Sequence, residues 1–195
     1  AVSTRPDISF TVSQLSQHLE RPGASHWRAF IHLLRYISGT KNYSLCIGGG
    51  CPTPEVFTDA DYANCTEGRR SYSGYLARWG HSVISWKSHK QPTVSTSTTE
   101  AEYRSLYTGV QEAVWLLNLI RSLRITSIKS IPIRVDNQAA IALAKNAMFQ
   151  QRTKHIDIKF HWTREVVNSG EVTLSYIPTT QMQADGLTKS LARPK

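Results

Sequence analysis

The segment EVFTDADYA, residues 55–63, places two aspartates inside a run of residues that is typical of a β-strand. Side chains on a strand alternate between its two faces, so Asp59 and Asp61 are expected to share one face. A carboxylate buried in a sheet loses its hydration, which costs free energy unless a partner compensates the charge. The chain must therefore fold so that something compensates a carboxylate at position 59.

The residues before this segment form a separate unit in the hydrophobic pattern. Apolar residues recur at helical spacing over 8–19 and again over 27–37, and the helix-breaking RPG at 21–23 separates the two runs. The pattern predicts an αα-hairpin within residues 1–40. A DNA-reading helix-turn-helix is one use of such a hairpin, and packing against a core is the simpler one. Residues 41–54 are rich in glycine and proline and are predicted to be a linker.

Residues 55–195 alternate strands and helices. Strands are predicted at 55–63, 74–80, 81–88, 131–136 and 171–178, and helices at 98–124, after Asn137, around 156–167 and at 181–192. Gly80 and His81 are placed for a tight hairpin, and Asn137 can cap the helix that follows it. The order is βββαβααβα, which is an α/β arrangement.

Further carboxylates stand where strands end and helices begin. Glu100 and Glu102 open the long helix, Asp136 closes the fourth strand, and Asp185 lies at the start of the last helix. Functional groups of α/β sheets gather at such positions, so these acids can converge with Asp59. Converging carboxylates repel, and an all-oxygen set suits Mg²⁺ or Mn²⁺ rather than zinc. The helix dipole also stabilises acidic side chains at the start of a helix. This explains the position of Glu100, Glu102 or Asp185 taken singly, but it does not explain an aspartate inside the strand VFTDA.

The overall charge favours an acidic partner. The 195 residues carry 23 Lys and Arg against 14 Asp and Glu, a net charge of +9, and a phosphate backbone is the simplest partner for that excess. Three cysteines lack the spacing of a zinc site and make an odd count, so a reducing compartment is expected. No apolar run approaches the length of a membrane span, and a membrane partner is not expected.

Seven short motifs carry a resemblance to a known family. They are TRPDIS at 4–9, LRYISGT at 34–40, FTDADYA at 57–63, TEAEY at 99–103, VDNQAA at 135–140, RTKHIDI at 152–158 and ADGLTK at 184–189. In this collinear order they resemble the C-terminal end of the polyprotein of copia-type LTR retrotransposons, where a ribonuclease H domain follows the reverse transcriptase. The resemblance implies a ribonuclease H-like fold, a five-stranded mixed sheet with helices on both faces. It also implies that residues 1–40 are the tail of the polymerase thumb, 41–54 the connection and 55–195 the ribonuclease H domain.

The resemblance also implies the site residues. The catalytic and metal-binding acids of the family fall on Asp59, Glu102, Asp136 and Asp185. Helical spacing does not choose between Glu100 and Glu102, which flank the apolar stripe on opposite sides, so the choice of Glu102 rests on the Glu-Tyr pair of the family. Asp61 is an accessory acid at most. Candidate phosphate contacts are Arg69, Arg70, Lys87, Lys90, Arg152 and Lys154.

The implied reaction is hydrolysis of the RNA strand of an RNA–DNA hybrid, with two Mg²⁺ ions that Mn²⁺ can replace. The implied partners are the hybrid and the rest of the reverse transcriptase polyprotein. The implied location is the virus-like particle of the element in the cytoplasm, or the nucleus. One departure concerns histidine: the loop IPTTQMQAD, residues 177–185, lacks the histidine that many cellular ribonucleases H have there. His155 or His161 could replace it, although a packed or surface role is the simpler explanation for each.

Two alternatives remain open at this point. One is a non-catalytic remnant that binds a duplex or supports a polymerase, and the other is an integrase-like strand-transfer enzyme. The presence of all four acids favours the nuclease over the remnant, because mutually repelling groups have no other evident use. The integrase hypothesis needs only three acids and usually a Cys/His zinc module, which this sequence lacks.

Overall fold

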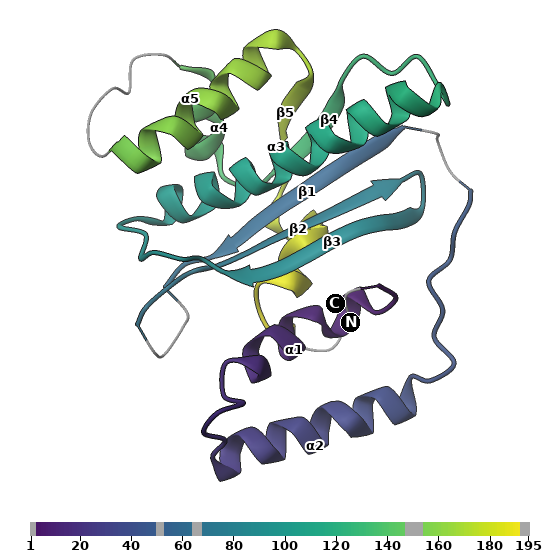
Figure 1. Ribbon diagram of the computed structural model, residues 1–195, viewed down its shortest axis with the longest axis vertical. Coiled ribbons are helices and arrows are strands. Elements are labelled where there is room, and N and C mark those ends of the chain that lie inside the picture. The colour runs from purple at the N-terminus through teal and green to yellow at the C-terminus, as the bar shows by residue number, and fades with distance from the viewer. Residues whose placement is uncertain (1–2, 50–52, 64–67, 147–153, 192–195) are drawn as a thin grey trace.

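A five-stranded mixed sheet forms the centre of the protein (Figure 1). The computed structural model describes residues 3–49, 53–63, 68–146 and 154–191, and the side chains of 154–157 lie outside the description. Strands β1 (Pro54–Asp61), β2 (Tyr72–Trp79) and β3 (Ser82–Lys90) form an antiparallel meander. Strands β4 (Ile131–Val135) and β5 (Val172–Tyr176) continue the sheet on the other side of β1, in parallel. The spatial order is β3-β2-β1-β4-β5, which confirms the predicted strands and the mixed sheet.

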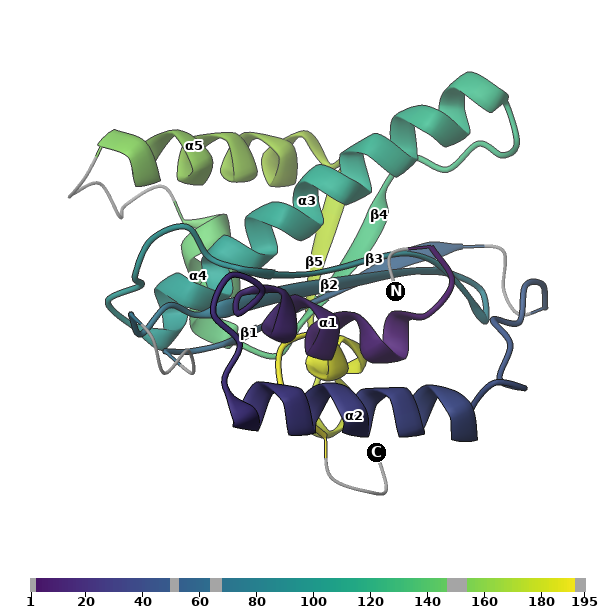
Figure 2. The same ribbon diagram turned by 60° about the horizontal axis from the view of Figure 1, so that its bottom comes forward.

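Three helices cover one face of the sheet: α3 (Thr98–Leu123), α4 (Gln138–Lys145) and α5 (Lys154–Ser169) (Figures 1 and 2). The main core lies between α3 and the sheet, and it includes Val56, Leu106 and Ile133. Helix α3 approaches β1 closely because Gly109 has no side chain: a Cβ there would lie 2.2 Å from Thr58 Cγ2. The buried Ser105 hydroxyl adds two hydrogen bonds, to the carbonyl oxygens of Asp59 (2.6 Å) and Gly74 (3.1 Å). These contacts fix the start of α3 beside the end of β1.

The helix starts follow the local sequence. The Ser97 side chain accepts a hydrogen bond from the Glu100 N–H, and the Asn137 side chain accepts one from the Ala140 N–H. Both are N-cap bonds of the kind that serine and asparagine favour. The predicted long helix and the predicted cap at Asn137 are confirmed.

The opposite face of the sheet is covered by the C-terminal segment and the first helix, α1 (Ser9–Ser16) (Figure 2). The prediction of an α-helix over 181–192 is wrong in type, because the described part consists of two short 3-10 helices, Thr179–Gln181 and η3 (Gln183–Leu187). Ala184 and Leu187 of η3 pack on Phe57 in a second, smaller core. Backbone N–H groups of the next two residues, 188 and 189, both bond to the Asp185 carbonyl, and the turn then ends. Ala184 and Leu187 both reach the second core from within the five residues of η3.

The predicted αα-hairpin is present, as α1 and α2 (Ala24–Gly39). Helix α1 packs on the sheet: the Phe10 and Tyr72 rings meet edge to face at 5.2 Å. Helix α2 lies beyond α1 and away from the sheet (Figures 1 and 2). Leu33 is the only residue of this helix that is buried. Its apolar stripe is instead largely exposed, with Trp27 61% and Leu34 44% accessible. Core packing of this stripe, the simpler expectation for the hairpin, is therefore wrong for α2.

Between the hairpin and β1, the described residues 43–49 form no regular structure, as expected of a linker. Cys46 in this segment is a free, exposed thiol, and the other two cysteines lie outside the described residues. Across the described ranges, no helix combines the length and the apolar character that crossing a bilayer requires.

Candidate active site

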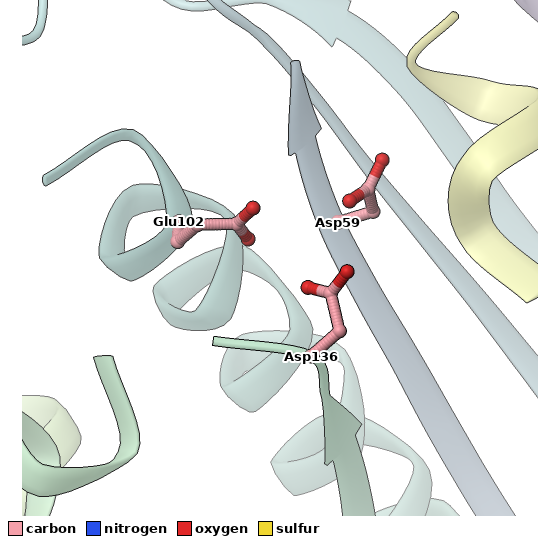
Figure 3. Close-up of side chains that lie close together, drawn as sticks. All are labelled: Asp59, Glu102 and Asp136. Carbon is pink, nitrogen blue, oxygen red and sulfur yellow. The ribbon is translucent and has the colours of Figure 1, made fainter. Parts of the chain in front are cut away.

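Three carboxylates meet at one end of the sheet, where β1 and β4 run side by side. The register pairs Thr58 with Val135, so Asp59 and Asp136, the next residues of the two strands, are neighbours. Glu102 comes from the first turns of α3. Ligand oxygens of Asp59, Glu102 and Asp136 all lie within 4.8 Å of one another. Figure 3 shows the three side chains around a common space, each from a different element.

Asp185 joins this group through the two residues that follow η3. Lys189 Nζ lies 2.8 Å from Asp185 Oδ1 and 3.9 Å from Asp59 Oδ2, so one ammonium group links the two aspartates. The Thr188 hydroxyl, which is fully buried, donates a hydrogen bond to Asp59 Oδ2. The structure thus brings all four predicted acids to one place, three in direct proximity and Asp185 beside Asp59.

Asp59, Glu102 and Asp185 are almost fully buried and Asp136 is half-buried, and burial changes the acidity of Asp59 and Glu102. Asp59 is 2% exposed and Glu102 8%. Burial raises the pKa of Asp59 to about 6, with a further rise from the charges of Asp185 and Asp136 and a partial offset by Thr188 and Lys189. Burial and the charges of Asp59 and Asp136 raise the pKa of Glu102 to about 9. Without added positive charge, the folded protein therefore holds Glu102 protonated at neutral pH.

Two oxygens of the group have no hydrogen-bond partner. Glu102 Oε2 and Asp136 Oδ1 are buried and unpaired among the described residues. Buried polar atoms without partners are rare in folded proteins, and a bound ion or water is one explanation for them. The atoms that could coordinate a metal ion here are all carboxylate oxygens, the ligands that Mg²⁺ and Mn²⁺ prefer. The residues present therefore fit a divalent cation of this kind.

Geometry separates the two glutamates that helical spacing leaves equivalent. The Glu100 carboxylate turns back to the start of α3, where it accepts hydrogen bonds from the Thr96 N–H and hydroxyl, both at 2.7 Å. It also forms an ion pair with Arg104 at 2.7 Å. Glu102, in contrast, faces the group of carboxylates. Glu100 is a capping residue, and Glu102 is the member of the site.

The loop after β5 contributes a hydroxyl instead of a histidine. Thr179 Oγ1 donates a 2.7 Å hydrogen bond to Asp136 Oδ2 and so fixes the side chain at the end of β4. His161 is exposed on α5, and the side chain of His155 is outside the described part of the chain. A third histidine, His89 on β3, is half-buried, and burial, with the charges of Lys87 and Lys159, lowers its pKa to about 4.

The predicted phosphate contacts are spread over several elements. Arg69 and Arg70 are exposed on the turn between β1 and β2, and Lys87 is exposed on β3. Lys90 is half-buried and donates to Gln17 Oε1 at 2.8 Å, which ties it to the C-terminal end of α1. The structure does not describe Arg152 or the side chain of Lys154.

Several residues near the site are visible only in three dimensions. Thr179, Thr188 and Lys189 contact the acids directly, and of these Lys189 has a signal in the sequence, its i,i+4 spacing from Asp185. Lys159 of α5 lies 5.2 Å from the centre of the Tyr107 ring on α3. Lys159 and Lys87 both lie near His89, because the charge of each lowers the pKa of that histidine.

Comparison with solved structures defines the class of fold. The N-terminal RNase H domain of a Mycobacterium tuberculosis protein, solved as a fusion with maltose-binding protein, superposes with a TM-score of 0.51 at 13% identity over 71% of this chain and 91% of that chain. LC11-RNase H1, solved in complex with an RNA/DNA hybrid, gives 0.50 at 13% identity, over 70% and 94% of the two chains. The fold is that of ribonuclease H domains.

Sequence comparison then identifies the family. A retrovirus-related Pol polyprotein from transposon TNT 1-94 of Nicotiana tabacum is 42% identical over 194 residues, all of this chain. The corresponding polyprotein from transposon RE2 of Arabidopsis thaliana is 38% identical over 97% of the chain. The chain belongs to the retrovirus-related Pol polyproteins of transposons, and it spans 14% and 13% of the length of these two relatives. No protein-family profile matches it.

Proposed function

We propose that this chain is a metal-dependent endonuclease that hydrolyses the RNA strand of RNA–DNA hybrids during reverse transcription of a retrotransposon. The observation that carries the proposal is the group of three carboxylates within 4.8 Å, two of them with unpaired buried oxygens, at one end of a ribonuclease H sheet. Four carboxylates in one place repel one another, which costs free energy unless a cation neutralises their charge. The arrangement is therefore better suited to metal-dependent chemistry than to packing.

The four acids would hold the metal ions. Asp59 is common to both parts of the site, because it lies near Glu102 and Asp136 on one side and shares Lys189 with Asp185 on the other. Bound Mg²⁺ or Mn²⁺, two ions in this proposal, would activate water and stabilise the leaving oxygen of an in-line displacement. The raised pKa of Glu102 means that a cation must displace a proton there before the carboxylate can bind it.

The surrounding residues keep these acids in place. The hydroxyls of Thr188 and Thr179 hold the Asp59 and Asp136 side chains, and Ser105 fixes the backbone at Asp59. These bonds reduce the freedom of the carboxylates before any ligand arrives, which is how a folded site lowers the entropic cost of reaction.

The substrate would be recognised by charge and shape. The exposed basic residues Arg69, Arg70 and Lys87, with Lys159, provide positive charge for phosphates on a chain of net charge +9. Proteins distinguish A-like duplexes mainly through shape and 2′-hydroxyl contacts and not through base sequence. A related fold in complex with an RNA/DNA hybrid supports this choice of substrate.

The wider context is part of the proposal. Residues 1–40 would belong to the polymerase part of the polyprotein, 41–54 would form the connection and 55–195 the nuclease domain, with the rest of the polyprotein as partner. The nuclease would then work in the virus-like particle of the element, in the cytoplasm or the nucleus.

The test is cleavage of a hybrid with labelled RNA by the wild type and two matched variants, with Mg²⁺ and with EDTA. Glu102→Gln should abolish cleavage, and Glu100→Gln, which changes a capping residue of the same helix, should retain most of it if folding is preserved. Equal activity of Glu102→Gln and the wild type, or cleavage in EDTA, would refute the proposal. Hybrid binding with no cleavage by any variant would instead favour the non-catalytic alternative.

A further inference from the structure

One pair of carboxylates in the site already has a positive charge beside it. Lys189 Nζ lies 2.8 Å from Asp185 Oδ1 and 3.9 Å from Asp59 Oδ2. The lysine side chain is 35% exposed, whereas both aspartates are almost completely buried. The preceding residue, Thr188, is buried and also bonds to Asp59 Oδ2. The turn after η3 thus supplies a hydroxyl and an ammonium group to the same carboxylate.

The other two acids feel the charge of Lys189 only at longer range, without a direct ion pair. Within the described ranges, neither Glu102 nor Asp136 forms an ion pair with a lysine or arginine, and each has a buried oxygen without a hydrogen-bond partner. Asp136 receives a neutral donor, the Thr179 hydroxyl. The site is therefore asymmetric: Lys189 pairs directly with Asp59 and Asp185, and it acts on Glu102 and Asp136 only at longer range.

We propose that Lys189 is a positioning residue that serves as a resident cation for Asp59 and Asp185 and competes with a divalent ion for this pair. The inference rests on the proposed metal-dependent function. A divalent ion near Asp185 Oδ1 would meet the Lys189 ammonium at close range, and like charges at such distances repel strongly in a buried site. Cation binding on this side therefore requires Lys189 to move toward solvent, for which its partial exposure leaves room.

Two consequences follow for metal binding. The side of Glu102 and Asp136 should bind a divalent ion more tightly than the side of Asp185. In addition, the ion pair of Lys189 with Asp59 should keep the turn after η3 in contact with Asp59 when no metal is bound. The chain should therefore fold without metal.

The experiment is a titration of the full chain with Mn²⁺ alone, without nucleic acid, by calorimetry and by the EPR signal of free Mn²⁺. Lys189→Met should tighten the weaker Mn²⁺ site at least about tenfold, since one charge within 4–6 Å changes the proton affinity of a carboxylate about 10- to 1,000-fold. Lys189→Arg, which keeps the charge, should resemble the wild type. Lys41→Met, which removes an exposed lysine after α2, is the matched control and should change nothing.

Thermal unfolding in EDTA and in Mn²⁺ supplies a second measurement. Lys189→Met should melt at a lower temperature in EDTA and regain the wild-type midpoint in Mn²⁺, because the ion replaces the missing charge. The inference is wrong if Lys189→Met binds Mn²⁺ only as tightly as the wild type or Lys189→Arg does. It is also wrong if Mn²⁺ does not restore the melting midpoint of Lys189→Met. If the wild type itself binds no Mn²⁺, the proposed function fails, and the inference fails with it.

Discussion

Glu102→Gln should remove a pH dependence of folding stability. Burial, and then the charges of Asp59 and Asp136, raise the pKa of Glu102 from an ordinary value of 4.5 to about 9. Between these two values the folded protein keeps a proton that the unfolded chain has released. The free energy of unfolding therefore falls as the pH rises through this range.

The size of the effect follows from the pKa difference. One group that is protonated only in the folded state changes the free energy of unfolding by about 1.4 kcal/mol per pH unit. Between pH 7 and 8.5 the wild type should lose about 2 kcal/mol from this group. Asp59, with a pKa raised to about 6, and His89, with a pKa lowered to about 4, add only small changes above pH 7, because their folded and ordinary pKa values all lie below 7. Glu102 thus dominates this window.

The measurement is urea unfolding in EDTA at pH 7 and pH 8.5 for the wild type, Glu102→Gln and Glu100→Gln. Glu102→Gln should lose the slope and exceed the wild type in stability at pH 8.5. Burial opposes the charge of Glu100, but hydrogen bonds from Thr96 and Arg104 lower its pKa overall, so its contribution is complete above pH 5. Glu100→Gln should therefore lower stability equally at both pH values. Equal wild-type stability at the two pH values, or an unchanged slope in Glu102→Gln, would show that Glu102 does not hold this proton in the folded protein.

Three further predictions concern packing, binding and proton transfer. Gly109→Ala should destabilise the fold by about 1–3 kcal/mol, because the new Cβ would overlap Thr58. Gly39→Ala, which has open space around it, should not destabilise the fold. Equal melting temperatures for these two variants would contradict the close packing of α3 on β1. Hybrid affinity should fall steeply with salt, and Lys87→Ala should reduce the log–log slope by about 1, while a flat salt response would exclude phosphate contacts. The cleavage rate should rise with pH through neutrality without a histidine step, and a step that His161→Ala erases would show that an imidazole takes part.

Local signals in the sequence sufficed for most of the fold. Ser97 and Asn137 are helix caps whose bonds depend only on residues within three positions, so their helices begin where the sequence predicts. The strands are likewise set by short apolar runs bounded by turn residues. The order of these elements and the resemblance together predicted the mixed sheet.

Two elements were not predictable in this way. The segment 181–192 has a helix-like apolar pattern, but its described part forms 3-10 turns, from which Ala184 and Leu187 reach the second core. The stripe on α2 has a helical period that indicates burial, but the structure leaves Trp27 61% and Leu34 44% exposed. The spacing of apolar residues predicts which face of a helix is apolar, but it does not predict what packs against that face.

The candidate site was predictable in its residue types and only partly in its geometry. Asp59 stood out because a strand interior has no structural use for a carboxylate. Glu100 and Glu102 could not be distinguished by spacing, since the capping bonds of Glu100 depend on how Thr96 and Arg104 are placed. The roles of Thr188 and Lys189 depend on β1 and η3 meeting across a long sequence separation, which no local pattern encodes.

Asp59, the aspartate inside the first strand, is the residue whose substitution tests the proposed nuclease activity most simply. Wild type and Asp59→Asn are incubated with an RNA–DNA hybrid labelled on either strand, and binding and cleavage are measured separately in Mg²⁺ and in EDTA. The wild type should cut only the RNA strand and only with Mg²⁺, and Asp59→Asn should bind the hybrid at least as well without cutting it. Cleavage by Asp59→Asn at the wild-type rate would contradict the account.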